Sequence, residues 1–123
     1  MSTQTKRVKL EASLNKLAMV GDVEGVAVVS RDGLLVASRL PQEMDPGILC
    51  SMSAAMHAAG EVTLSEMKKE TCKVVTAESE QSIVMAYSLD PQRILVALFS
   101  SKANLGLIRM EMLKTADELR RLL

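Results

Sequence analysis

Hydrophobic residues follow two kinds of spacing along this chain, and together they predict an ordered series of helices and strands. Leu10, Leu14 and Leu17 recur at intervals of three and four residues, which is the stripe of an amphipathic helix. The runs VEGVAVVS and RILVALFS are instead apolar at almost every position, which is typical of strands covered on both faces. In chain order, the pattern predicts a helix at 6–19, strands at 23–30 and 34–39, a helix at 46–68, strands at 72–78, 82–89 and 93–100, and a helix from about 104 to the C-terminus.

Turn and capping residues support these boundaries. Asp32-Gly33 separates the first two strands and is typical of a tight hairpin turn, which needs positive φ angles. Asp45 is suited to cap the middle helix, with Pro46 at its first position. Asn104 or Ser101 would cap the last helix. The loops between the last three strands are short, so neighbouring strands there are predicted to be antiparallel.

These elements predict a single α+β domain that spans residues 1–123, with the polar residues 1–5 disordered. The αββαβββα order would place helices on both faces of a five-stranded antiparallel sheet. The first, fourth and fifth strands are apolar on both sides and belong in the middle of the sheet. The second and third strands are shorter or more polar at their ends and fit its edges. The predicted spatial order is therefore 2-1-5-4-3.

The predicted middle helix carries more apolar surface than one sheet can cover. We expect one stripe to face the sheet, and a helix that is apolar around most of its circumference needs burial on a second side as well. We interpret the surplus as a face for a second subunit, and the alternative is an ordinary core helix flanked by connecting loops. The sheet-facing stripe is predicted to be Ile48, Met52, Ala55, Ala59 and Val62.

The predicted third strand indicates an association site of another kind. It is an edge strand without proline, and unpaired edges invite pairing with another chain. A two-fold homodimer that joins these edge strands and sets the middle helices side by side would cover both surfaces. The predicted interface residues are Leu49, Met52, Ser53, Met56, Ala59, Gly60, Thr63, Lys73, Val74, Val75, Thr76 and Ala77.

Composition argues against several classes of partner. The chain has 15 basic and 15 acidic residues, one Tyr, one Phe and no Trp, so it lacks the positive field and stacking platforms of a nucleic-acid-binding protein. Cys50 and Cys72 lack metal-ligand spacing, and we expect buried, reduced thiols. No run reaches the roughly 18 apolar residues of a membrane span, and the first nine residues lack a signal-peptide core. We therefore expect a cytoplasmic protein without membrane insertion.

The sequence contains no recognisable catalytic constellation. His57, the single histidine, has no nucleophile and carboxylate at a familiar spacing, so we interpret it as a buried or interface residue. Glu61, Glu66 and Glu70 follow a helical spacing that places them on a solvated face. Neither GxxxxGK[ST] nor GxGxxG occurs. We expect no enzymatic activity, no cofactor and no metal, and hence a binding or assembly module.

Two segments, taken together, resemble the roadblock/dynein light chain family, including its prokaryotic MglB-like members. The first is VEGVAVVSRDGLLVAS, in which a Val-Glu-Gly-Val strand, an Asp-Gly turn and a Leu-x-Val-Ala-Ser strand follow one another. The second is ANLGLIR at 103–109, after the last strand. Ser53–Ala55 and the element order agree, and the resemblance extends roughly from Val8 to Leu119. The fold would be a profilin/longin-like layer sandwich.

The resemblance implies a noncatalytic dimeric regulator that binds a Ras-like small GTPase and modulates its GTP hydrolysis. Middle helices and third strands would pair, and the two sheets would become continuous. The regulator would remodel the GTPase without inserting an arginine finger, so we nominate no catalytic arginine. One alternative is a light-subunit assembly module of a motor or membrane-scaffold complex. Another is a PAS/GAF-like small-molecule sensor, which the two aromatic residues disfavour.

Overall fold

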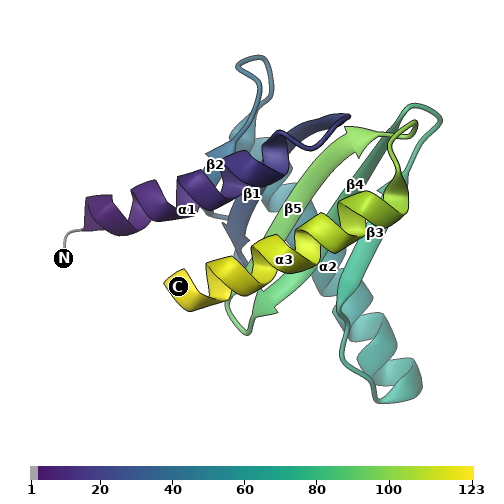
Figure 1. The fold of residues 1–123 in the computed structure, drawn as a ribbon. Helices are drawn as coiled ribbons and strands as arrows, with labels where there is room; N and C mark the ends of the chain where they lie inside the picture. Colours follow the sequence, from purple (N-terminus) through teal and green to yellow (C-terminus); the bar gives the residue numbers. More distant parts are fainter. Residues whose placement is uncertain (1–2) are drawn as a thin grey trace.

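Figure 1 shows the fold in a computed structural model that describes residues 3–123. Residues 3–5, which the sequence predicted to be disordered, continue the first helix, because polar residues can extend the hydrogen-bonded backbone once Leu10 and Leu14 anchor it. Residues 1 and 2 lie outside the described part. The elements are α1 (Thr3–Ala18), β1 (Val23–Ser30), β2 (Leu35–Arg39), α2 (Pro46–Lys68), β3 (Val74–Glu78), β4 (Ser82–Asp90), β5 (Arg93–Ser100) and α3 (Leu105–Leu122).

The five strands form one antiparallel sheet in the order β2-β1-β5-β4-β3, which confirms the predicted topology. The central strands β1 and β5 are buried at nearly all inner positions, as their two-sided apolar sequences require. Strand β3 begins at Val74, where it pairs with Tyr87, and not at Cys72 as predicted. The sheet therefore has a short edge strand on each side.

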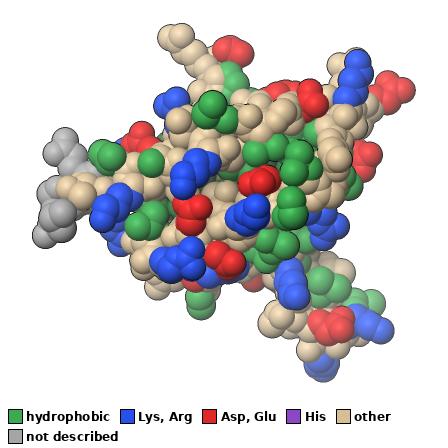
Figure 2. Space-filling model, viewed as in Figure 1, with side chains coloured by type: hydrophobic (Ala, Val, Ile, Leu, Met, Phe, Trp, Pro, Cys, Tyr) green, Lys and Arg blue, Asp and Glu red, His purple; other side chains and the backbone are tan. Residues whose placement is uncertain are grey.

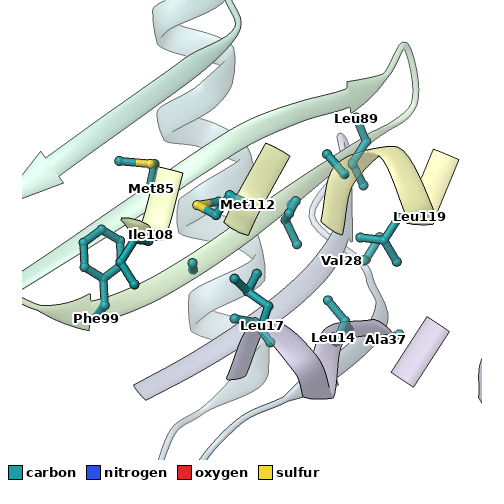
Figure 3. Close-up of a cluster of buried hydrophobic side chains, with 14 of the residues drawn as sticks. Leu14, Leu17, Val28, Ala37, Met85, Leu89, Phe99, Ile108, Met112 and Leu119 are labelled. Carbon is teal, nitrogen blue, oxygen red and sulfur yellow. The ribbon is translucent and has the colours of Figure 1, made fainter. Parts of the chain in front are cut away.

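The helices cover the two faces of the sheet unequally (Figure 1). Helices α1 and α3 contact one another on one face, and α2 lies on the other. The larger core fills the space between the sheet and the α1–α3 pair (Figure 3), where Leu14, Leu17, Phe99, Ile108 and Met112 are fully buried. A smaller core lies under α2 and comprises Ala27, Val29, Cys50, Ala86, Ile94 and Val96.

Local signals in the sequence set the ends of the helices and the first turn. The side chain of Asp45 accepts hydrogen bonds from the backbone N–H groups of Gly47 (2.9 Å) and Ile48 (3.2 Å), as expected of an N-cap. Asn104, and not Ser101, caps α3 through the N–H of Leu107 at 3.1 Å. Gly33 adopts a φ of 89° in the β1–β2 turn, which confirms the predicted need for positive φ there.

Candidate functional site

Helix α2 turns a different face to the sheet from the one that its sequence suggested. The stripe predicted to cover the sheet points outward: Ile48, Met52 and Val62 are each more than 60% exposed, and Ala55 and Ala59 are also exposed. That prediction was wrong because α2 is apolar around most of its circumference, so the spacing of its apolar residues does not select the buried face. The residues of α2 that are buried against the sheet are Cys50, Ser53, Ala54 and His57.

The second half of α2 has little support from its own chain. His57 is the last buried residue of the helix, Leu64 is half-buried, and Val62 and Met67 are exposed. The C-terminal turns project beyond the sheet before the chain returns to β3 (Figure 1). Since helices in proteins owe most of their stability to packing of an apolar face, a projecting helix end with exposed Val62 and Met67 indicates a surface for another molecule.

Strand β3 offers an unpaired backbone edge beside this helix. Among the described strands it pairs only with β4, and its residues Thr76, Ala77 and Glu78 are exposed. Gly60 of α2 faces Val75 of β3 so closely that a β-carbon on Gly60 would overlap Val75 Cγ2. Helix α2 and the edge of β3 therefore form one continuous surface, which we call the α2–β3 surface.

The structure distributes the predicted interface residues between an outer and an inner group. The outer, exposed residues are Met52, Ala59, Thr63, Lys73, Thr76 and Ala77. Leu49, Met56, Gly60, Val74 and Val75 are half-buried, and Leu49 and Met56 pack against the smaller core. Ser53 is only 4% exposed and faces its own sheet. The interface itself stays a prediction, now weighted toward the outer group.

A cluster of polar side chains under α2 was not predicted from the sequence. Glu61, which we expected on a solvated face, is half-buried and accepts a hydrogen bond from Arg31 Nη1. Arg31 also donates from Nη2 to Ser88 Oγ (2.7 Å) and to the carbonyl oxygen of Asp90 (2.9 Å). The β1–β2 turn, the end of β4 and α2 are thereby tied together. Glu61 differs from Glu66 and Glu70, which are exposed as predicted.

His57 is the fourth side chain of this cluster and is buried between α2 and the sheet. Its side chain is 1% exposed, and Nδ1 lies 3.1 Å from Glu61 Oε1 and 3.4 Å from Arg31 Nη1. Nε2 is buried without a hydrogen-bond partner among the described residues. The four-residue spacing of His57 and Glu61 was the only signal in the sequence for this arrangement. Together with the Ser88 hydroxyl, which accepts from Arg31, the cluster joins side chains of α2, β4 and the β1–β2 turn.

Both cysteines are free and buried, as predicted. Burial raises the pKa of the Cys50 thiol, and burial together with the nearby Glu61 carboxylate raises that of Cys72. A raised pKa keeps a thiol protonated and unreactive at neutral pH. Within residues 3–123, no three potential metal ligands of the His, Cys, Asp or Glu type gather in one place. None of the helices described there is long and apolar enough to cross a membrane.

Comparisons with known proteins place this fold. The sequence profile of the Roadblock/LC7 domain matches residues 9–99. An uncharacterised protein of Methanocaldococcus jannaschii is 36% identical over 114 residues, which cover 93% of this chain and 95% of the relative. Among solved structures, Myxococcus xanthus MglB superposes with a TM-score of 0.86 at 23% identity, covering 93% of this chain and 94% of that one. Acanthamoeba castellanii profilin IA superposes with a TM-score of 0.62 at 15% identity, covering 94% and 96%.

Proposed function

The chain belongs to the Roadblock/LC7 domain family, and from this membership we propose that it is a noncatalytic homodimeric platform that binds a Ras-like small GTPase and modulates its GTP hydrolysis. The observation that carries the proposal is the α2–β3 surface, in which a projecting helix end with exposed apolar side chains adjoins an unpaired strand edge. The proposed setting is the cytoplasm, where GTP is available and the free thiols of Cys50 and Cys72 stay reduced.

Pairing of two chains across the α2–β3 surface would satisfy the exposed groups of both. Antiparallel pairing of the two β3 edges would supply partners to their free backbone groups. The outward faces of the two α2 helices would then meet through Met52, Ala59 and Thr63. Ala59 and Thr63 are small enough to allow a close approach of the helices, and the Thr63 hydroxyl already donates to the carbonyl oxygen of Ala59 at 2.7 Å.

A separate apolar patch supports a position for the GTPase. Leu34, Leu35 and Ile48 are exposed where the β1–β2 turn meets the start of α2. A β-carbon on Gly33 would lie 3.2 Å from the Cα of Ser51, so the turn packs directly against the helix. Strand β2 lies at the opposite edge of the sheet from β3. Leu34 and Leu35 would therefore remain free in a dimer paired through β3, and we assign GTPase binding to the patch around them.

The core between the sheet and the α1–α3 pair is filled by side chains, which disfavours the alternative of a small-molecule sensor. A PAS/GAF-like domain needs a ligand cavity between its sheet and helices. Here Leu14, Leu17, Phe99, Ile108 and Met112 occupy the space between the sheet and the α1–α3 pair (Figure 3).

The proposal is tested with the Ras-like GTPases of the organism of origin, each purified and loaded with GTP. Phosphate release is measured with and without the protein, together with binding by fluorescence polarisation of a labelled nucleotide. We expect one GTPase to bind and its hydrolysis rate to change. Binding without any change in rate would instead support the light-subunit assembly module. The proposal fails if no GTPase binds.

A further inference from the structure

A small cavity opens on the face of the sheet opposite α2, where α3 passes the β3 side. Val74, Met85 and Tyr87 form its floor from strands β3 and β4. Met112 and Leu113 form its wall from α3. Figure 2 shows hydrophobic side chains gathered where α3 meets this side of the sheet. The volume of the cavity is about 240 Å³.

The charged side chains that line this cavity are both positive. Lys73 precedes β3 and Arg109 projects from α3, three residues before Met112 and therefore on the same side of the helix. Both are exposed, and neither forms an ion pair with an acidic side chain among the described residues. The lining contains no Asp or Glu. By contrast, Lys114 of α3 pairs with Glu111. An apolar cavity is thus bordered by two cations without counter-charges.

We propose that this cavity binds a short acidic segment of a partner protein. One apolar side chain of the segment would lie on Val74, Met85 and Tyr87, and flanking carboxylates would pair with Lys73 and Arg109. The guanidinium group of Arg109 can hold a carboxylate through two parallel hydrogen bonds. The volume is below the roughly 300–1,000 Å³ of most small-molecule sites, and it suits one or two side chains better than a cofactor.

A membrane surface fits these features less well. Bilayers are recognised by convex apolar elements or by clusters of several basic residues, whereas this site is concave and has two cations. The chain as a whole has no net charge to attract an anionic lipid surface. A peptide segment with alternating acidic and apolar residues matches both the cavity and the charge.

The site goes beyond the proposed GTPase regulation and does not depend on it. All its lining residues come from a single chain, and it lies on the face of the sheet opposite α2. Lys73 and Val74 also belong to the predicted dimer interface, so the cavity borders that interface. A dimer paired through β3 would carry two such cavities on one side of the joined sheet. The protein could then hold a partner there while a GTPase occupies the patch at Leu34, Leu35 and Ile48. This arrangement would link two different proteins through one platform.

The test uses a nine-residue peptide with one central Leu flanked by Glu and Ser residues, followed by NMR of the isotope-labelled protein. We expect saturable shift changes at Val74, Tyr87 and Met112. Arg109→Glu should weaken binding about tenfold or more, because it replaces attraction by repulsion. Lys102→Glu, an exposed change of the same charge outside the cavity, should leave the affinity unchanged. Arg109 is exposed, so the variant should fold, which its melting temperature verifies.

Control peptides and a second variant test whether binding depends on this cavity. A peptide with Gln in place of Glu and one with Ser in place of Leu should each bind more weakly than the original. Ala59→Arg, designed to prevent dimer formation, should bind the original peptide as well as the wild type does. The proposal is overturned if the peptide causes no shifts at these residues, if Arg109→Glu binds equally well, or if only phosphatidylserine vesicles bind.

Discussion

Gly60 of α2 and Val75 of β3 touch so closely that no β-carbon fits between them. The sulfur of Cys72 would also lie 3.4 Å from such an atom. This contact sets the distance between the helix and the edge strand. It thereby holds in one surface the two features that we propose to join two chains.

Replacing Gly60 by alanine should separate α2 from β3. Alanine favours a helix by about 1 kcal/mol over glycine, but here its β-carbon overlaps Val75, so we expect lower thermal stability and a weaker dimer. Differential scanning calorimetry and sedimentation equilibrium measure the two effects. Gly106→Ala in α3 is the matched control, because its nearest neighbour would lie at 3.5 Å and the substitution should be neutral or stabilising. An unchanged Gly60→Ala dimer would show that this spacing does not matter for association.

A charge on the outward face of α2 should prevent dimer formation. Ala59→Arg places an unpaired cation where the two helices are proposed to meet, and we expect the dimer Kd to rise about 100-fold or more. Sedimentation velocity over a range of concentrations measures the change. Val8→Arg on α1 adds the same charge at an exposed apolar position on the other face of the sheet and should have no effect. Met56→Arg should also break the dimer, but it would lower stability too, because Met56 packs against the smaller core.

A negative charge beside the β1–β2 turn should separate GTPase binding from dimer formation. Leu34 is 65% exposed, so Leu34→Asp should fold normally, while an acidic group in the proposed apolar contact should weaken GTPase binding about tenfold or more. Fluorescence polarisation and sedimentation follow the two properties on the same sample. If Leu34→Asp binds the GTPase as the wild type does, the patch is assigned to the wrong place.

Neutralising Glu61 should destabilise the attachment of α2. Glu61→Gln removes the charge that Arg31 pairs with and leaves that guanidinium partly buried, so we expect a loss of about 1–3 kcal/mol in the free energy of unfolding. Urea denaturation followed by circular dichroism measures it. Glu66→Gln, an exposed change on the same helix, should stay within about 0.5 kcal/mol of the wild type. Equal stabilities of the two variants would mean that the cluster contributes nothing.

Ionisation of the buried thiols should weaken the fold at high pH. The pKa of Cys50 is raised above its ordinary value of 9.0 by burial, so the thiol loses its proton more readily in the unfolded chain than in the folded one. Stability is fully present below that value and falls as the pH rises through it. Urea denaturation at about pH 8 and about pH 10 should show a larger loss for the wild type than for Cys50→Ala. Equal losses would mean that Cys50 does not contribute to the alkaline instability.

The sheet could be predicted from the sequence, whereas the orientation of α2 could not. Strands β1, β4 and β5 carry apolar residues on both of their faces, so the pattern alone places them in the middle of the sheet. Helix α2 is apolar around most of its circumference, and such a helix has no preferred inward side by periodicity. Its inward side carries the buried Ala54 and His57, and Gly60 lies against Val75 at the edge of the sheet.

The polar cluster and the cavity depend on contacts that local patterns do not encode. Arg31 and Glu61 lie in a turn and a helix that are distant in sequence, and only the folded sheet brings them together. Lys73 and Arg109 also line one cavity although they are distant in sequence, because Lys73 precedes β4 and Arg109 follows β5. By contrast, Asp45 and Asn104 act on backbone groups two or three residues away, and their capping roles could be predicted.

The projecting end of α2 makes the local order of this chain depend on its concentration. Residues 62–68 contain no buried side chain and lie beyond the Glu61 ion pair, so we expect their helix to open by local fluctuation in a single chain, long before the sheet unfolds. A second copy that covers them would suppress this opening by mass action. Amide exchange in those turns should therefore slow as the protein concentration rises past the dimer Kd, while exchange in β1 and β5 stays constant. The second chain would stabilise α2 as a bound ligand does, and dilution would dissociate that chain and restore the local opening.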